Sequence, residues 1–114
     1  MRAPHLATGD WGEDLAADWY RGHGYEVLDR NWRCAAGEID LVAERDRLVV
    51  IVEVKTRRTD KYGPAASAVH PAKQRRLRGL AIEWLRAREV HGVDLRFDVV
   101  AITGEDLRII HAAF

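Results

Sequence analysis

The stretch Leu48-Val49-Val50-Ile51-Val52-Glu53-Val54-Lys55 decides the fold. Its first five residues are all apolar, so we expect a strand whose two faces are both covered, as in the centre of a layered sheet. Side chains two residues apart on a strand share a face, so Glu53 and Lys55 should project together. The stretch therefore predicts a central strand that ends in two charged groups.

Apolar periodicity and turn residues divide the rest of the chain into helices and strands. Apolar residues recur at helical spacing before Gly24 and after Pro71, which indicates two helices. Elsewhere, alternating or continuous apolar runs indicate strands. A hairpin is expected around Arg45-Asp46. The predicted elements are a helix at 10–23, strands at 25–33, 38–44 and 47–55, a helix at 71–90, and strands at 95–102 and 107–111. We therefore expect a single α/β domain over residues 1–114 with the order αβββαββ.

Length and composition exclude several classes of protein. A chain of 114 residues with 47% hydrophobic and 32% charged residues fits one globular domain. No apolar run could span a bilayer, and residues 1–10 do not look like a signal peptide, so we expect a cytoplasmic protein without a membrane partner. Cys34 is the only cysteine, which excludes an intrachain disulfide and a thiolate zinc cluster. The sequence also lacks a glycine-rich phosphate loop and a nucleophilic Ser or Cys motif, which argues against nucleotide-hydrolysing motors and acyl-transfer enzymes.

The formal net charge is zero, but the charge is distributed unevenly along the chain. Residues 1–54 hold 6 basic and 11 acidic side chains, a net of −5, and residues 89–114 hold 2 and 5, a net of −3. Residues 55–88 hold 10 basic and 2 acidic side chains, a net of +8. Such a basic block attracts phosphate through Coulombic steering and counterion release. The block therefore predicts a nucleic-acid partner.

The contacts with nucleic acid are expected along this basic block. The helix predicted at 71–90 carries its apolar residues on one stripe and most of its basic residues elsewhere, so its outer face is basic. Arginine is suited to bidentate contacts with phosphate. The candidate nucleic-acid-binding residues are Arg57, Arg58, Lys61, Lys73, Arg75 and Arg76. An ordinary solvated helix face is the alternative interpretation.

Two acidic residues stand where core residues are expected. Asp40 and Glu53 are each flanked by apolar neighbours on a predicted strand, and Glu38 shares a face with Asp40. A buried, isolated carboxylate must find a cation or take up a proton, and Mg²⁺ or Mn²⁺ suits clustered oxygen ligands. Adjacent strands could bring Asp40 and Glu53 together, and the backbone carbonyl of Val54 could add a third ligand. The pattern predicts a divalent metal site.

Such a site would suit the hydrolysis of phosphodiester bonds. The metal would lower the pKa of its water and neutralise charge on the phosphate, while Lys55 could orient the nucleophile and stabilise the transition state. In the alternative interpretation, Glu53 and Lys55 form an ordinary ion pair and Asp40 caps a turn. An E-x-K tripeptide by itself favours that alternative. The aspartate 13 residues upstream, across a predicted hairpin, makes the two interpretations about equal.

Four motifs resemble those of the bacterial YraN family. They are Gly37-Glu38-Ile39-Asp40-Leu41, Val52-Glu53-Val54-Lys55-Thr56-Arg57, Lys73-Gln74-Arg75-Arg76-Leu77 and Arg96-Phe97-Asp98-Val99-Val100. The resemblance covers nearly the whole chain. That family is similar to the archaeal Holliday-junction resolvases and belongs with the restriction-endonuclease-like proteins that carry the PD-(D/E)xK signature. The resemblance implies a restriction-endonuclease-like fold, with a mixed β-sheet flanked by helices.

The resemblance also implies a function. Asp40, Glu53 and Lys55 match the signature as catalytic residues of an endonuclease that uses Mg²⁺ or Mn²⁺ and cuts DNA, in preference to RNA, at branched or Holliday-junction structures. Ile39 replaces the proline of the signature, as is usual among the resembled resolvases. A homodimer is expected by the same resemblance, because a two-fold arrangement can place two sites on a symmetric junction.

Three further residues match positions of the family pattern. Glu13 matches a helix-one glutamate near the metal, although Asp10-x-x-Glu13 also fits a capping box at the start of the helix. Gln74 matches a polar residue that faces the site and joins the candidate nucleic-acid-binding set, with a solvated helix surface as the alternative. Asp98 matches the family pattern, and we expect it to brace an arginine.

Two other functions stay open at this point. The chain could be a nucleic-acid-binding module that cuts nothing, because resemblance establishes the ancestry of a site better than its present activity. It could also be a protein-interaction adaptor that docks a partner through exposed aromatic residues such as Trp32 and Tyr62.

Overall fold

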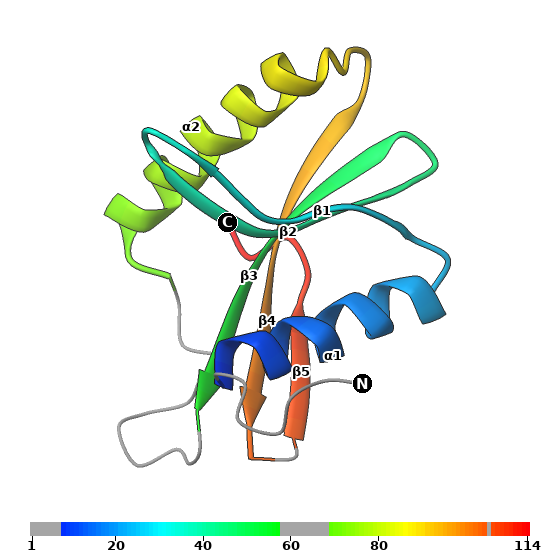
Figure 1. Ribbon diagram of the computed structural model, residues 1–114, viewed down its shortest axis with the longest axis vertical. Coiled ribbons are helices and arrows are strands. Elements are labelled where there is room, and N and C mark those ends of the chain that lie inside the picture. The colour runs from blue at the N-terminus through cyan, green and yellow to red at the C-terminus, as the bar shows by residue number, and fades with distance from the viewer. Residues whose placement is uncertain (1–7, 58–68, 105) are drawn as a thin grey trace.

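Within residues 8–57, 69–104 and 106–114, which the computed structural model describes, the chain forms two helices and five strands (Figure 1). They are α1 (Thr8–Gly22), β1 (Glu26–Cys34), β2 (Gly37–Arg45), β3 (Leu48–Arg57), α2 (Pro71–Arg88), β4 (Asp94–Thr103) and β5 (Asp106–Ile110). The order is αβββαββ, as predicted. The predicted boundaries agree with the observed ones to within two residues at each end of each element.

The strands form one mixed sheet in the order β1-β2-β3-β4-β5. β3 pairs with β4 in parallel, and the other neighbours are antiparallel. Helix α2 is the crossover that a parallel pair requires. The predicted central strand is confirmed, since Val49, Val50, Ile51 and Val52 are at most 1% exposed. This arrangement is compatible with the expected restriction-endonuclease-like fold.

The hairpin between β2 and β3 turns one residue later than predicted. Its two turn residues are Asp46 and Arg47, which have positive φ values of 52° and 65°. Two successive left-handed residues are the signature of a type I′ turn, whose twist matches that of the flanking strands. The turn thereby sets β2 and β3 in register.

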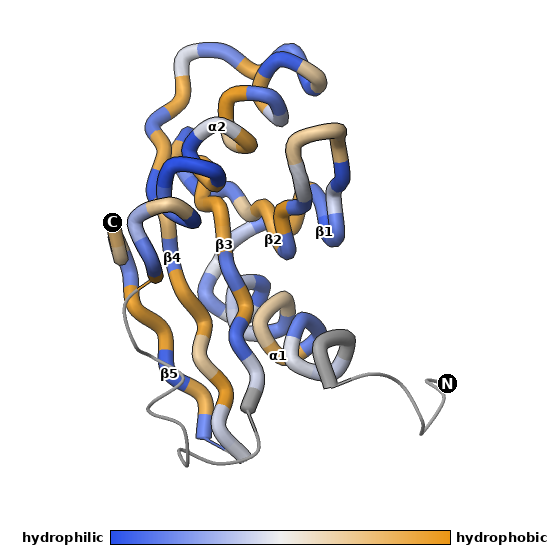
Figure 2. Tube along the Cα trace, turned by 90° about the vertical axis from the view of Figure 1, so that its left-hand side faces the viewer, coloured by the Kyte–Doolittle hydropathy of each residue, from blue (hydrophilic) through white to orange (hydrophobic). Residues whose placement is uncertain are grey.

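Each face of the sheet is covered by one helix. Tyr20 of α1 packs in a core with Val50 and Val52, whereas Trp84 of α2 packs with Val49 and Ile51. Alternate residues of β3 thus contact opposite helices, which is why its apolar run is continuous. Figure 2 shows the hydrophobic colour along β3 and β4, with α1 beside the sheet. Neither of the helices in the described part of the chain is long and apolar enough to cross a membrane.

The buried carboxylate of Asp98 ties the end of the chain to the core. Its oxygens accept hydrogen bonds from Arg96 Nε at 2.8 Å, Tyr20 OH at 2.7 Å and the backbone N–H of Ala112 at 3.1 Å, and His111 Nδ1 lies 2.8 Å away. The expectation that Asp98 braces an arginine is confirmed. Burial raises the pKa of Asp98, but the hydrogen bonds from Arg96, Tyr20 and His111 outweigh it and hold the pKa below its usual range.

Candidate active site

The candidate site lies where β2 separates from β3. The pairing of these two strands ends with Leu41 opposite Val52. Beyond that point β2 continues beside β1, and β3 continues beside β4 (Figure 1). The sheet therefore forks at the next residue on each strand, Asp40 on β2 and Glu53 on β3. The fork opens space next to two side chains that the sequence marked as out of place in a core.

Asp40 is held across this fork by a backbone amide. The N–H of Val54 on β3 donates to Asp40 Oδ2 at 2.8 Å. The carboxylate thus replaces the backbone carbonyl of β2 that would accept this hydrogen bond if the two strands stayed paired. Asp40 therefore does not cap a turn, as one interpretation of the sequence suggested. The predicted role of the Val54 carbonyl as a metal ligand stays a prediction.

Burial and acidic neighbours raise the affinity of Asp40 for a proton. Burial, followed by Coulombic repulsion from Glu53, raises the pKa of Asp40 to about 7. Glu13 and Glu38 add to the repulsion, and the hydrogen bond from Val54 opposes it only in part. The ionised form of Asp40 is therefore disfavoured in the metal-free protein. A divalent cation bound to its carboxylate would stabilise that ionised form.

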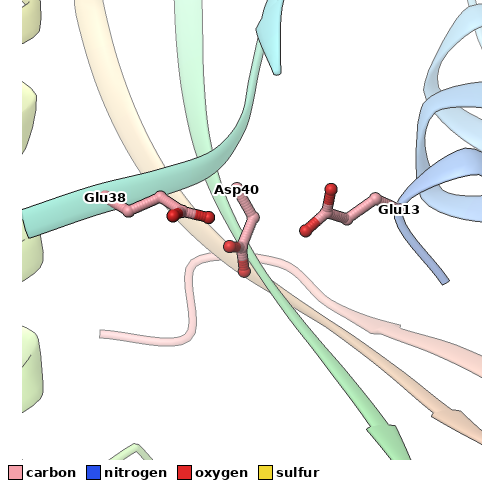
Figure 3. A group of neighbouring side chains, drawn as sticks. All are labelled: Glu13, Glu38 and Asp40. Atoms are coloured by element: carbon pink, nitrogen blue, oxygen red, sulfur yellow. The ribbon is translucent and has the colours of Figure 1, made fainter. Parts of the chain in front are cut away.

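Three carboxylates converge at the fork. Figure 3 shows the Glu38 and Asp40 carboxylates, both from β2, close together, with that of Glu13 turned toward them from α1. One oxygen of each lies within 4.8 Å of the others. Oxygen ligands lie about 2.0–2.6 Å from Mg²⁺ or Ca²⁺, so ligands on opposite sides of one ion are about 4–5 Å apart. The spacing and the oxygen chemistry of this cluster both fit a hard divalent cation.

Glu38 was not assigned as a ligand from the sequence. The signal was present, because Glu38 and Asp40 are two residues apart on a strand and share a face. Its carboxylate also accepts a hydrogen bond from Arg33 Nε at 2.8 Å, across the β1–β2 pair. From the sequence alone, an ordinary cross-strand ion pair would therefore have explained Glu38. Only the approach of Glu13 on α1 shows that Glu38 belongs to an acidic cluster.

A glycine lies where helix α1 approaches β3. A Cβ added at Gly12 would lie 2.2 Å from Thr56 Oγ1 and 3.3 Å from Ile102 Cδ1, so a larger residue there would have to displace these side chains. The next residue, Glu13, is 8% exposed and faces Asp40. The capping-box interpretation of Asp10-x-x-Glu13 is wrong, because α1 already begins at Thr8 and Asp10 lies inside it. The position of Glu13 is the one that the resemblance implied.

Glu53 and Lys55 occupy the end of β3 as the sequence predicted. The Glu53 side chain is only 12% exposed, and its Oε1 lies 3.0 Å from the Nζ of Lys73 on α2. Lys55 is partly buried two residues further along the strand. The structure therefore brings Asp40 and Glu53 to the same fork, and it adds a lysine from α2 that contacts Glu53 directly.

A pocket of about 280 Å³ opens between the fork and α2. It is lined by Gly37, Glu38, Asp40, Glu53, Lys73, Arg76, Leu77 and Leu80. Its lining includes the carboxylates of Glu38, Asp40 and Glu53, which we call the acidic floor, and Lys73 and Arg76 of α2, which we call the basic wall. A second cavity of about 300 Å³, near the C-terminal Phe114, has no carboxylate in its lining. Only the first of these two cavities combines ligands for a cation with partners for an anion.

The predicted nucleic-acid-binding residues are placed as follows. Lys73 and Arg76 line the pocket, and Arg75 is exposed on α2. The Gln74 side chain donates from Nε2 to the carbonyl of Val69 at 2.9 Å and so anchors the start of α2. Arg58, Lys61 and the side chain of Arg57 lie outside the described residues, as does Tyr62. Trp32 is partly buried against the core on the α2 side of the sheet.

Comparisons with known proteins agree with the motifs. The model of a family described as "Uncharacterised protein family UPF0102" matches residues 12–102. A UPF0102 protein of Rhodococcus opacus (strain B4) is 54% identical over 100 residues, which cover 88% of this chain and 85% of that protein. One of Alkalilimnicola ehrlichii (strain ATCC BAA-1101 / DSM 17681 / MLHE-1) is 46% identical over 113 residues, which cover 98% of this chain and 90% of that protein.

Proposed function

Since the chain belongs to the UPF0102 family, which is the YraN family that its motifs resemble, we propose that it is an endonuclease dependent on Mg²⁺ or Mn²⁺. Its substrate is DNA in preference to RNA, with branched or Holliday-junction structures as the first candidates. The proposal places it in the cytoplasm as a homodimer. The observation that carries it is the convergence of the Glu13, Glu38 and Asp40 carboxylates from α1 and β2 at one fork, beside Glu53 of β3, where the pKa of Asp40 is raised to about 7.

Five residues of the fork have a role in the proposed reaction. Asp40 and Glu53 would hold the ion from two strands, with Glu13 assisting from α1 and the Val54 carbonyl as a further ligand. When bound, the ion would lower the pKa of a water molecule and neutralise charge on the scissile phosphate. Lys55 would orient the attacking water and stabilise the negative charge that develops in the transition state.

The basic wall of the pocket supports a polyanionic substrate. Lys73 and Arg76 lie beside the carboxylates, so a phosphate that approached the fork would meet positive charge on one side. Arg75 extends this surface along the exposed face of α2. A backbone phosphate held there would be close to the ion-binding carboxylates. The same juxtaposition favours DNA cleavage over docking of a protein partner.

A panel of nucleic acids tests the proposal. We expect purified protein to cut at least one of branched, flapped, single-stranded and duplex DNA in Mg²⁺ or Mn²⁺, and to cut RNA more slowly. The cleavage should disappear in EDTA and in Asp40→Asn, because both remove the ion. Binding without cleavage in either metal would instead identify an idle nucleic-acid-binding module. Cleavage that persists in Asp40→Asn would show that the activity comes from elsewhere.

A further inference from the structure

The ion pair between Lys73 and Glu53 joins the basic wall of the pocket to its acidic floor. The Lys73 Nζ lies 3.0 Å from Glu53 Oε1, and the two side chains are 44% and 12% exposed. Both residues line the pocket at the fork. A largely buried carboxylate that is proposed to bind metal is therefore already neutralised in this structure by an ammonium group from another element.

The position of Lys73 on α2 is unfavourable without an anion. Helix α2 begins at Pro71, so Lys73 lies in the first turn, which contains no acidic residue. The helix dipole places partial positive charge at that end and disfavours a lysine there. Arg76, three residues further on, adds repulsion between like charges. Lys73 therefore depends on a negative partner, and Glu53 is the one that the structure provides.

We infer that Lys73 exchanges one anion for another when the metal binds: it neutralises Glu53 in the metal-free protein and passes to a DNA phosphate once a divalent cation takes Glu53. The inference rests on the proposed function and adds to it a residue that couples metal binding to DNA binding. A divalent cation carries twice the charge of the ammonium and repels it. The half-exposed lysine has a flexible four-carbon stem, so it can turn toward a phosphate at the pocket mouth.

The exchange makes metal binding and DNA binding cooperative. In the metal-free protein, Lys73 competes with the cation for Glu53, and Glu53 competes with phosphate for Lys73. Binding of either ligand removes one of these competitions, so each ligand raises the affinity for the other by the same factor. Lys73 should therefore contribute little to DNA affinity in the metal-free protein. In the metal-loaded protein it should contribute fully.

The first arm of the test measures Mn²⁺ affinity without DNA, by calorimetric titration at fixed ionic strength. Lys73→Ala should bind Mn²⁺ about 2- to 5-fold more tightly than the wild type, because the competing ammonium is gone. Arg76→Ala is the matched control, since it removes one positive charge from the same pocket but no ion pair of Arg76 is seen within the described residues. It should change the affinity by less than about half of the Lys73→Ala factor. Circular dichroism establishes that both variants are folded.

The second arm measures affinity for a short DNA duplex, in EDTA and in Ca²⁺. Lys73→Ala should weaken binding several-fold in Ca²⁺ but by less than about twofold in EDTA, where Glu53 holds the ammonium in the wild type. The salt dependence should lose about one unit of slope in Ca²⁺ only. Arg76→Ala should weaken binding by similar factors in both conditions, because its guanidinium is not engaged by Glu53.

The possible outcomes separate this inference from the proposed function. Equal effects of Lys73→Ala and Arg76→Ala on Mn²⁺ affinity would overturn the exchange, as would an equal loss of DNA affinity in EDTA and in Ca²⁺. If Mn²⁺ still binds to the wild type and fails to bind to Asp40→Asn, the metal site stands without the exchange. Absence of Mn²⁺ binding by the wild type would instead overturn the proposed function itself.

Discussion

Replacing Asp40 with asparagine should stabilise the metal-free protein at pH 8 and abolish its metal-dependent cleavage. The stabilising effect follows from the pKa of Asp40, which rises from 3.8 to about 7 in the folded protein. Below pH 3.8 the carboxyl group is protonated in both the folded and the unfolded states. Between pH 3.8 and about 7 the unfolded state releases this proton while the folded state still holds it, so stability is lost as the pH rises through this window.

The size of this effect depends on how much solvent screens the carboxylate. A shift of one pKa unit corresponds to about 1.4 kcal/mol, and Asp40 is partly exposed, so we expect Asp40→Asn to raise the free energy of unfolding by about 2 kcal/mol at pH 8. The gain should shrink toward zero at pH 4. Urea titrations of both proteins in EDTA, at the two pH values, measure the difference. An Asp40→Asn variant no more stable than the wild type at pH 8 would contradict the assignment.

Asp40→Asn should also abolish catalysis. Asparagine keeps the size of the side chain and an oxygen that can accept from Val54, but it loses the negative charge that attracts the ion. Because a bound metal contributes several kcal/mol of transition-state stabilisation, cleavage should fall at least about 10³-fold. Functional sites generally contain residues that lower the stability of the fold while they serve activity. Stability and activity measured on one variant therefore test a single explanation.

Removing the Asp98 carboxylate should cause a large loss of stability. Its side chain is fully buried, and it accepts hydrogen bonds from Arg96, Tyr20 and the backbone of Ala112. In Asp98→Ala these donors lose their acceptor, and Arg96 becomes a partly buried cation without its partner. Loss of one member of a buried ion pair costs about 3–5 kcal/mol, a large part of the stability of a small domain.

Asp106→Ala is the control for Asp98→Ala. Asp106 and Arg108 form an ion pair whose side chains are 61% and 71% exposed, so its loss should cost less than about 1 kcal/mol. Urea denaturation of the two variants and the wild type at pH 7 compares them. Similar midpoints for the two variants would show that the buried network contributes no more than a surface pair.

The apolar patterns of the sequence were sufficient to predict the helices and strands of this fold. Each pattern reflects how an element contacts the helix or sheet packed against it. The continuous apolar run of β3 follows from its contact with both helices. The helix start was less predictable, since Asp10-x-x-Glu13 is a short pattern that also arises inside helices. The turn was misplaced by one residue because the positive φ of Arg47 has no signature as strong as glycine.

The parts of the site that come from tertiary contacts could not be predicted. The spacing of Asp40 and Glu53 was enough to predict that they lie on paired strands. The point where β2 leaves β3 depends instead on the pairing of β2 with β1 and of β3 with β4. The contact of Lys73 with Glu53 depends on where the crossover returns α2 to the sheet. No local pattern contains that information.

The central claim is that the acidic fork binds a divalent cation through Asp40. Its most direct test is a titration of wild-type protein and Asp40→Asn with Mn²⁺ at pH 8, followed by calorimetry or by the paramagnetic signal of the free ion. We predict saturable binding by the wild type, competition by Mg²⁺, and loss of binding in Asp40→Asn. Equal binding by the two proteins, or no saturable binding by the wild type, would contradict the claim.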